Sequence, residues 1–220
     1  MADIAFDLRF FGMGSSRLPC VVRVPPAPRG LVLFAHGSFS SHRSPRNNAV
    51  AERLSEAGFV TMLFDLLSWS EARNRANVFD IGLLSGRLID AMGWIAGEAE
   101  LAALPIGLFG ASTGAGAALR AAALCPARVA AVVSRGGRPD LAGAQTLGQV
   151  QCPVQLIVGS LDQEVIGLNR AAAQLLRGPR ELVIVPGAGH LFEEPGAMEQ
   201  VVEHARSWFM QHLAQHRASL

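Results

Sequence analysis

The residues best suited to chemistry lie in the segment Gly110–Gly114, which reads Gly-Ala-Ser-Thr-Gly and centres Ser112 in a G-x-S-x-G pattern. The apolar run 106–109 before it predicts a buried strand, and the Ala-rich stretch 113–124 predicts a helix. A tight turn between them would expose the serine hydroxyl and aim free helix N–H groups at the reacting atom. Glycine suits both ends of the pattern because a Cβ would collide there. The pattern predicts a nucleophilic serine.

His190 is the expected base, because a serine hydroxyl is a weak nucleophile until a base accepts its proton. In sites of this kind an acid and then a histidine follow the serine along the chain, each after a later strand. His190 follows the last predicted strand, 181–185, in a Gly-rich loop. The other histidines precede the serine or lie on the predicted terminal helix: His36, His42, His204, His212 and His216.

Asp162 is the preferred acid to orient His190, because it closely follows the penultimate predicted strand. Asp140 follows the strand before that one, where it could instead cap a short helix. Glu164 is a nearby fallback whose other role would be favourable charge at a helix N-terminus. Asp65 precedes the serine and violates the expected order.

Two backbone N–H groups should stabilise the negative charge that develops on a carbonyl oxygen under attack. Thr113, at the start of the helix after the serine, supplies one. The second is expected from the loop after the apolar run 31–35, with Ser38 as the first choice and Phe39 as the alternative. The sequence thus predicts an oxyanion hole formed by two separate loops.

Four arginines fall in two loops that should border this site: Arg43, Arg46, Arg135 and Arg138. Arginine can bind a carboxylate through two parallel hydrogen bonds. Arg135 is best placed, just beyond the predicted strand 129–133, where a side chain can still reach the crevice. We therefore expect Arg43 and Arg135 to bind an anionic substrate. The alternative is that all four are surface arginines.

The elements that must position these residues alternate between strands and helices. After an opening hairpin, buried strands are expected over 31–35, 59–64, 106–109, 129–133, 154–158 and 181–185. Helices are expected over 45–57, 80–98, 113–124 and 164–176, and from 195 onward. This alternation predicts one mostly parallel sheet of about seven to eight strands with helices on both faces. The ligand site of such a sheet lies beyond the carboxyl ends of its strands.

Composition narrows the classes of function. Half of the residues are hydrophobic and 17% are charged, which predicts a single globular domain over 1–220. The net charge of +1 gives no reason to expect a nucleic acid or an acidic surface as partner. The three cysteines are odd in number and widely spaced, so neither a disulfide framework nor a metal site is expected. We therefore expect the protein in a reducing cytoplasm. An acidic N-terminus without an apolar run, and no stretch of 18 apolar residues, argue against export and membrane insertion. The oligomeric state stays open.

Four motifs together resemble an α/β-hydrolase over nearly the whole chain: Gly110–Gly114, Gly159–Asp162, Gly189-His190 and His36-Gly37. The compact size is most similar to the dienelactone-hydrolase-like branch. The resemblance implies an α/β-hydrolase fold without a cap domain and a Ser112–Asp162–His190 triad that needs no cofactor. Dienelactone hydrolases proper carry cysteine at the position of Ser112, so the serine favours an ordinary esterase.

We therefore expect a serine carboxylesterase that forms an acyl-enzyme from a small-molecule ester. Related enzymes insert a cap in the segment 134–151, which is short here, so we expect an open site that favours short acyl groups and accepts anionic or lactone substrates. Two alternatives remain: a thioesterase or acyltransferase with the same triad, and a non-catalytic binding protein of this fold.

Overall fold

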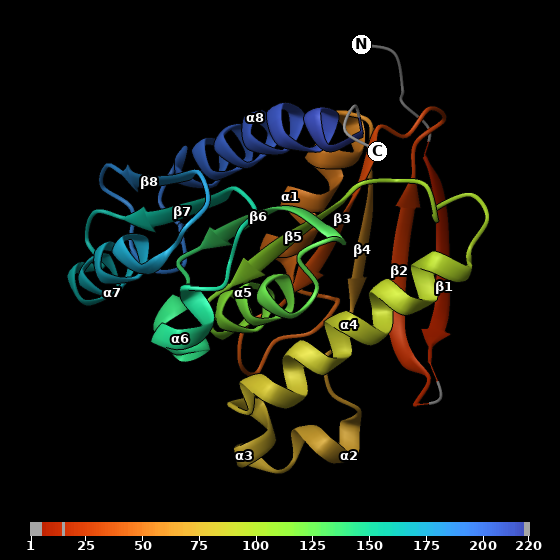
Figure 1. The fold of residues 1–220 in the computed structure, drawn as a ribbon, viewed down its shortest axis with the longest axis horizontal. Helices are drawn as coiled ribbons and strands as arrows, with labels where there is room; N and C mark the ends of the chain where they lie inside the picture. The colour runs from red at the N-terminus through yellow and green to blue at the C-terminus, as the bar shows by residue number, and fades with distance from the viewer. Residues whose placement is uncertain (1–5, 15, 218–220) are drawn as a thin grey trace.

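An eight-stranded sheet forms the centre of the computed structural model, which describes residues 6–14 and 16–217 (Figure 1). The strands are β1 (Asp7–Met13), β2 (Leu18–Val24), β3 (Gly30–Ala35), β4 (Phe59–Phe64), β5 (Ile106–Ala111), β6 (Val129–Arg135), β7 (Val154–Gly159) and β8 (Arg180–Val185). Their order is β1-β2-β4-β3-β5-β6-β7-β8. The pairs β1–β2 and β2–β4 are antiparallel, and all later pairs are parallel. The predicted fold class is confirmed.

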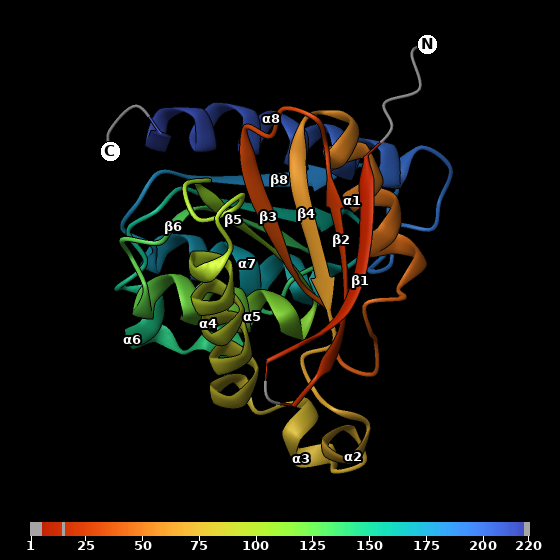
Figure 2. The same ribbon diagram turned by 90° about the vertical axis from the view of Figure 1, so that its right-hand side faces the viewer.

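Helices cover both faces of this sheet. They are α1 (Pro45–Glu56), α2 (Trp69–Ala72), α3 (Arg75–Val78), α4 (Ile81–Gly97), α5 (Thr113–Leu124), the 3-10 helix η1 (Pro139–Ala142), α6 (Ala144–Leu147), α7 (Gln163–Leu175) and α8 (Ala197–Arg217). Helices α1 and α8 pack on one face, and α4 and α5 pack on the other (Figure 2). Among the described helices, none is long and apolar enough to cross a membrane.

The central strands β3, β5 and β7 are buried along their whole length. Their near-continuous apolar sequences suit this position, because a parallel strand covered on both faces meets no water. The polar residues of the motifs follow directly at the carboxyl ends, where the loops after β3, β5, β7 and β8 begin. The fold therefore gathers these loops at one edge of the sheet.

Helices α2 and α3 were not predicted from the sequence. They lie between β4 and α4, below the carboxyl end of β4 in Figure 1. Each has four residues, too few for a hydrophobic period, and each is set by its cap. Ser68 and Glu71 form a reciprocal capping box at α2, and Asn74 caps α3. Local side-chain hydrogen bonds thus build a short helical wall beside the loop after β3.

Candidate active site

Ser112 occupies the turn between β5 and α5 with φ +50° and ψ −122°. A non-glycine residue rarely adopts positive φ, so the surrounding structure must hold this conformation. A Cβ on Gly114 would collide with the backbone of Ala35 and His36, and one on Gly110 with that of Ala115. Both glycines are therefore required by close backbone packing, and the turn is the expected nucleophile elbow in shape.

His190 and Asp162 meet at the same edge of the sheet. His190 Nδ1 lies 2.6 Å from Asp162 Oδ2, and the Asp162 side chain is only 15% exposed. The two loops are joined by further bonds, in which Gly187 N–H donates to Ser160 Oγ and Leu161 N–H donates to the Ala188 carbonyl. With Nδ1 bound to the carboxylate, Nε2 is the ring nitrogen left for proton transfer.

The loop of His190 also packs against the residues beside Ser112. Ser112 N–H donates to the Arg135 carbonyl at 3.2 Å, and the next residue, Gly136, has φ +51°. A Cβ on Gly136 would lie 3.0 Å from the His190 carbonyl oxygen and 3.6 Å from its Cε1. Within the described residues Ser112 Oγ makes no hydrogen bond, so the structure brings His190 into contact with Asp162 but not with the serine hydroxyl.

The two other carboxylates considered for the triad have different surroundings. Asp140 accepts two hydrogen bonds from Arg138, at 2.9 and 2.7 Å. Glu164 lies in the first turn of α7, as its alternative role predicts. The structure thus brings Asp162, and neither Asp140 nor Glu164, into hydrogen-bond contact with His190.

His36 connects the predicted oxyanion loop to the segment after β4. Its Nε2 accepts from Leu66 N–H at 3.0 Å, so Nδ1 carries the proton and donates to the Gly37 carbonyl at 2.9 Å. Burial lowers the pKa of His36, which favours this neutral form. A Cβ on Gly37 would lie 3.1 Å from Ser112 Cβ, so the loop that carries Ser38 rests directly against the serine.

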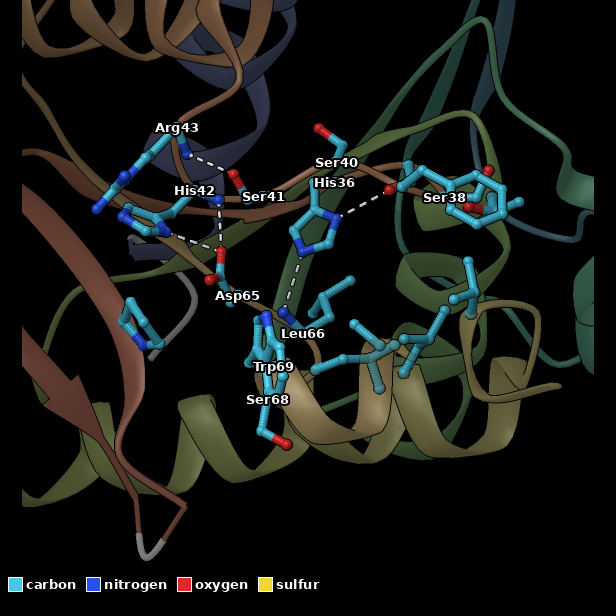
Figure 3. Close-up of a pocket in the computed structure, with 18 residues that line it drawn as sticks. His36, Ser38, Ser40, Ser41, His42, Arg43, Asp65, Leu66, Ser68 and Trp69 are labelled. Carbon is cyan, nitrogen blue, oxygen red and sulfur yellow. Dashed lines mark hydrogen bonds and ion pairs between the residues drawn. The ribbon is translucent and has the colours of Figure 1, made fainter. Parts of the chain in front are cut away.

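A pocket of about 420 Å³ adjoins this loop (Figure 3). Residues 36–43 after β3 form one wall and residues 65–69 after β4 form the other, with Ser38 and Thr113 among the lining residues. Apolar side chains from the α2–α4 region complete it, namely Ala72, Val78 and Leu84. The alternative oxyanion residue, Phe39, has φ +58° and makes an edge-to-face contact with Phe79, with ring centroids 6.0 Å apart. Ser38 and Thr113, the two residues predicted to form the oxyanion hole, thus line the same cavity as Phe39.

His42 and Asp65 were set aside in the sequence, yet they form a second histidine–carboxylate pair in this pocket. Asp65 Oδ1 accepts from His42 Nδ1 at 2.8 Å and from His42 N–H at 2.7 Å. The position of Asp65 directly after a buried strand, the same signal that singled out Asp162, could have identified it. The position of Asp65 before the serine in the chain excludes it only as the acid of the triad, and it does not exclude a contact with another histidine.

The four arginines considered for substrate binding lie in three kinds of surroundings, and only Arg43 lines the pocket. Arg46 pairs with Glu193 at 2.7 Å and Arg138 with Asp140, whereas Arg43 lines the pocket. The expectation that Arg135 lies beyond its strand is wrong, because β6 continues through it. Arg135 is 8% exposed and, within the described residues, has no ion pair. Burial, helped by the charge of Arg46, lowers its pKa to about 10.

The chain is similar to proteins of known structure, although no family model matches it. A crystal structure of a dienelactone hydrolase from Anabaena variabilis is 48% identical, with a TM-score of 0.90, and the match covers 95% of this chain and 98% of that one. Est1E from Butyrivibrio proteoclasticus matches at a TM-score of 0.79 over 94% of this chain and 99% of its own, but at 15% identity it shows the fold alone.

Two curated Mycobacterium tuberculosis proteins, provisionally named phosphoribosyl transferases, are 60% identical over 190 residues. That match covers 86% of this chain, which spans only 43% of the length of those relatives. Their name does not describe a hydrolase.

Proposed function

Because the chain belongs to the dienelactone-hydrolase-like branch of the α/β-hydrolases, we propose that it hydrolyses carboxylic esters through an acyl-enzyme on Ser112. The observation that carries this proposal is the 2.6 Å contact between His190 and Asp162, at the sheet edge where Ser112 is held at positive φ. The dienelactone hydrolase among its structural relatives, at 48% identity, supports hydrolysis. The transferase name of the mycobacterial relatives is inconsistent with this site.

In the first half of the proposed reaction, Ser112 Oγ attacks the ester carbonyl carbon while His190 Nε2 accepts its proton. Asp162 holds the ring and stabilises the imidazolium. The N–H groups of Ser38 and Thr113 bind the oxyanion. When the intermediate collapses, the C–O bond breaks and the alcohol leaves with the proton from His190.

In the second half, water attacks the acyl-serine while His190 again accepts a proton. Collapse releases the carboxylic acid and returns that proton to Ser112 Oγ. These steps use the chain's own residues and water, so we propose no cofactor or metal. We further propose a small-molecule ester with a short acyl group as substrate, with Arg43 and Arg135 favouring anionic substrates, including lactones that carry a carboxylate. A cytoplasmic location is proposed because the three cysteines are free thiols.

Labelling with a fluorophosphonate probe tests the nucleophile directly. We expect one adduct, mapped by peptide mass spectrometry to Ser112, and none in Ser112→Ala. Folded wild-type protein that stays unlabelled, or a variant labelled equally, would overturn the proposal and favour a non-catalytic binding protein. A panel of esters, thioesters and lactones, with alcohol and thiol acceptors added, would distinguish an esterase from a thioesterase or acyltransferase.

A further inference from the structure

The proposed reaction leaves the His42–Asp65 pair without a role, although several hydrogen bonds hold both residues in place. Asp65 directly follows β4, and its N–H donates to the Pro19 carbonyl. The loop of His42 is fixed from the other side, because Asn48 Nδ2 donates to the His42 carbonyl at 2.8 Å and Arg23 donates to Asn48 Oδ1 at 2.7 Å. The pair is therefore held rigidly at the wall of the pocket.

Two acceptor atoms of this pair are unused. Asp65 Oδ1 takes both hydrogen bonds from His42, so Asp65 Oδ2 and His42 Nε2 have no partner within the described residues. Both unpartnered atoms are accessible and not buried, and both residues line the pocket. Both ring nitrogens of the neighbouring His36 are already bonded, so His36 cannot serve a ligand.

The pocket extends from these acceptors toward Ser112, although Ser112 and His190 are not among its lining residues. Ser38 and Thr113 line it, and they follow Gly37 and Ser112, which pack against each other. Figure 3 shows His42 and Asp65 facing each other on the side of the pocket away from Ser38. Leu67, Trp69 and other apolar side chains also line this pocket. A ligand that fills it needs an apolar stem and a hydrogen-bond donor at its far end. A hydroxyl can donate such a bond without adding charge to a pocket that Asp65 and Arg43 already line with opposite charges.

We propose that Asp65, supported by His42, is a specificity-determining residue that accepts a hydrogen bond from a hydroxyl at the far end of the substrate group in this pocket. The preferred substrates are thus esters with a hydroxyl-terminated apolar group, such as a hydroxyaryl group. This inference rests on the proposed ester hydrolysis at Ser112. Hydrogen bonds to a charged acceptor favour the hydroxylated substrate by roughly 10- to 100-fold.

The test compares three p-nitrophenyl esters of 3-phenylpropionic acid that carry hydrogen, hydroxyl or methoxyl at the para position. A parallel set of 2-phenylethyl acetates carries the same substituents on the alcohol. A methoxyl group accepts but cannot donate, so the hydroxyl-to-methoxyl ratio of kcat/KM reports donation to Asp65. We expect a wild-type ratio of about 10 or more in one set.

The decisive variant is Asp65→Asn, which retains an oxygen to accept both bonds from His42 but replaces the free acceptor by an NH₂ donor. We expect its hydroxyl-to-methoxyl ratio to fall to near one. Asp90→Asn, an exposed change on α4 outside the pocket, should leave the ratio unchanged. A wild-type ratio near one in both sets, or an Asp65→Asn variant that slows all three esters equally, would overturn the proposal.

A binding measurement separates this inference from the proposed function. Calorimetry on Ser112→Ala should show tighter binding of 3-(4-hydroxyphenyl)propionamide than of its methoxyl analogue, whether or not Asp65→Asn is stable enough to assay. Preferential binding without any ester hydrolysis by the wild type would contradict the proposed function alone. Hydrolysis with neither preference would contradict the role of Asp65 alone.

Discussion

His190 Nδ1 lies 2.6 Å from Asp162 Oδ2, although the two residues are 28 positions apart in the chain. The contact follows from topology, because β7 and β8 are neighbouring parallel strands whose last residues, Gly159 and Val185, pair in register. Loops that leave such strands begin side by side at one edge of the sheet. A carboxylate in one loop and an imidazole in the next can then meet without distorting either strand.

Replacing Ser112 or His190 by alanine should lower kcat on the order of 10⁴-fold or more, since each acts only with the other. Asp162→Asn should also be severe, because an amide favours the wrong histidine tautomer. Initial rates with p-nitrophenyl butyrate measure these effects. Asp140→Asn is the matched control and should be mild, because Asp140 binds Arg138 instead. A greater loss in folded Asp140→Asn than in Asp162→Asn would show that the acid is assigned wrongly.

Gly114→Ala should destabilise the protein by about 3 kcal/mol or more, because the added Cβ meets backbone atoms that cannot move aside. Urea unfolding measures the effect. Gly86→Ala is the control, since a Cβ there on α4 meets nothing within 4 Å. That change should stabilise the protein by about 0.5–1 kcal/mol, the usual difference between glycine and alanine within a helix. Equal effects at the two positions would refute the steric argument for the elbow.

The sequence predicted most of the fold because its signals are local. The strand β5, the elbow and α5 follow from an apolar run, two glycines and an alanine-rich stretch. It did not predict helices α2 and α3, whose caps depend on polar pairs such as Ser68 with Glu71. Nor did it reveal that His42 meets Asp65, because that contact joins two loops through the pairing of β3 with β4. Asp162 and His190 could be paired in advance because both follow the serine in the order typical of a triad, whereas no such pattern links His42 with Asp65.

His36 should make stability depend on pH. Burial lowers its pKa in the folded protein, whereas in the unfolded chain it takes up a proton as pH falls through about 6.5. Stability from the neutral ring is therefore complete above that pH and is lost as pH falls from there toward the folded pKa. His36→Gln cannot titrate, so the gap between wild type and variant in free energy of unfolding should narrow below about pH 6.5. A gap that stays constant from pH 5 to 8 would contradict this account.

Acyl chain length should have little benefit beyond the size of the pocket. The segment 134–151, where related enzymes insert a cap, holds only the end of β6 and the short helices η1 and α6, so it offers no lid to cover a twelve-carbon chain. Each CH₂ that remains hydrated forgoes about 0.8 kcal/mol. We expect kcat/KM to be no higher for p-nitrophenyl laurate than for the butyrate, with the acetate as the short reference. A steady increase from acetate through butyrate to laurate would mean that a longer apolar surface binds the chain.

Arg135 should favour substrates with a carboxylate remote from the scissile bond. Its guanidinium is almost fully buried beside the charge of Arg46, and among the described residues no carboxylate pairs with it. A buried charge without a partner is costly, so an anion that reaches it gains more than it would at an exposed arginine. Two esters that differ only in a remote carboxylate should therefore differ in kcat/KM at low salt, in favour of the anion.

Arg135→Gln should abolish that preference and should leave the neutral ester almost unaffected. Arg138→Gln is the matched control, because Arg138 already pairs with Asp140 and should contribute nothing to anion selectivity. Stability provides a second readout: removing an uncompensated buried charge should not lower Tm, whereas loss of a structural ion pair would. Added short-chain dicarboxylate should raise Tm in wild type but not in Arg135→Gln, since a ligand stabilises only the form that binds it. Equal slowing of both esters by Arg135→Gln, or a wild type indifferent to the carboxylate, would leave Arg135 without a role in substrate binding.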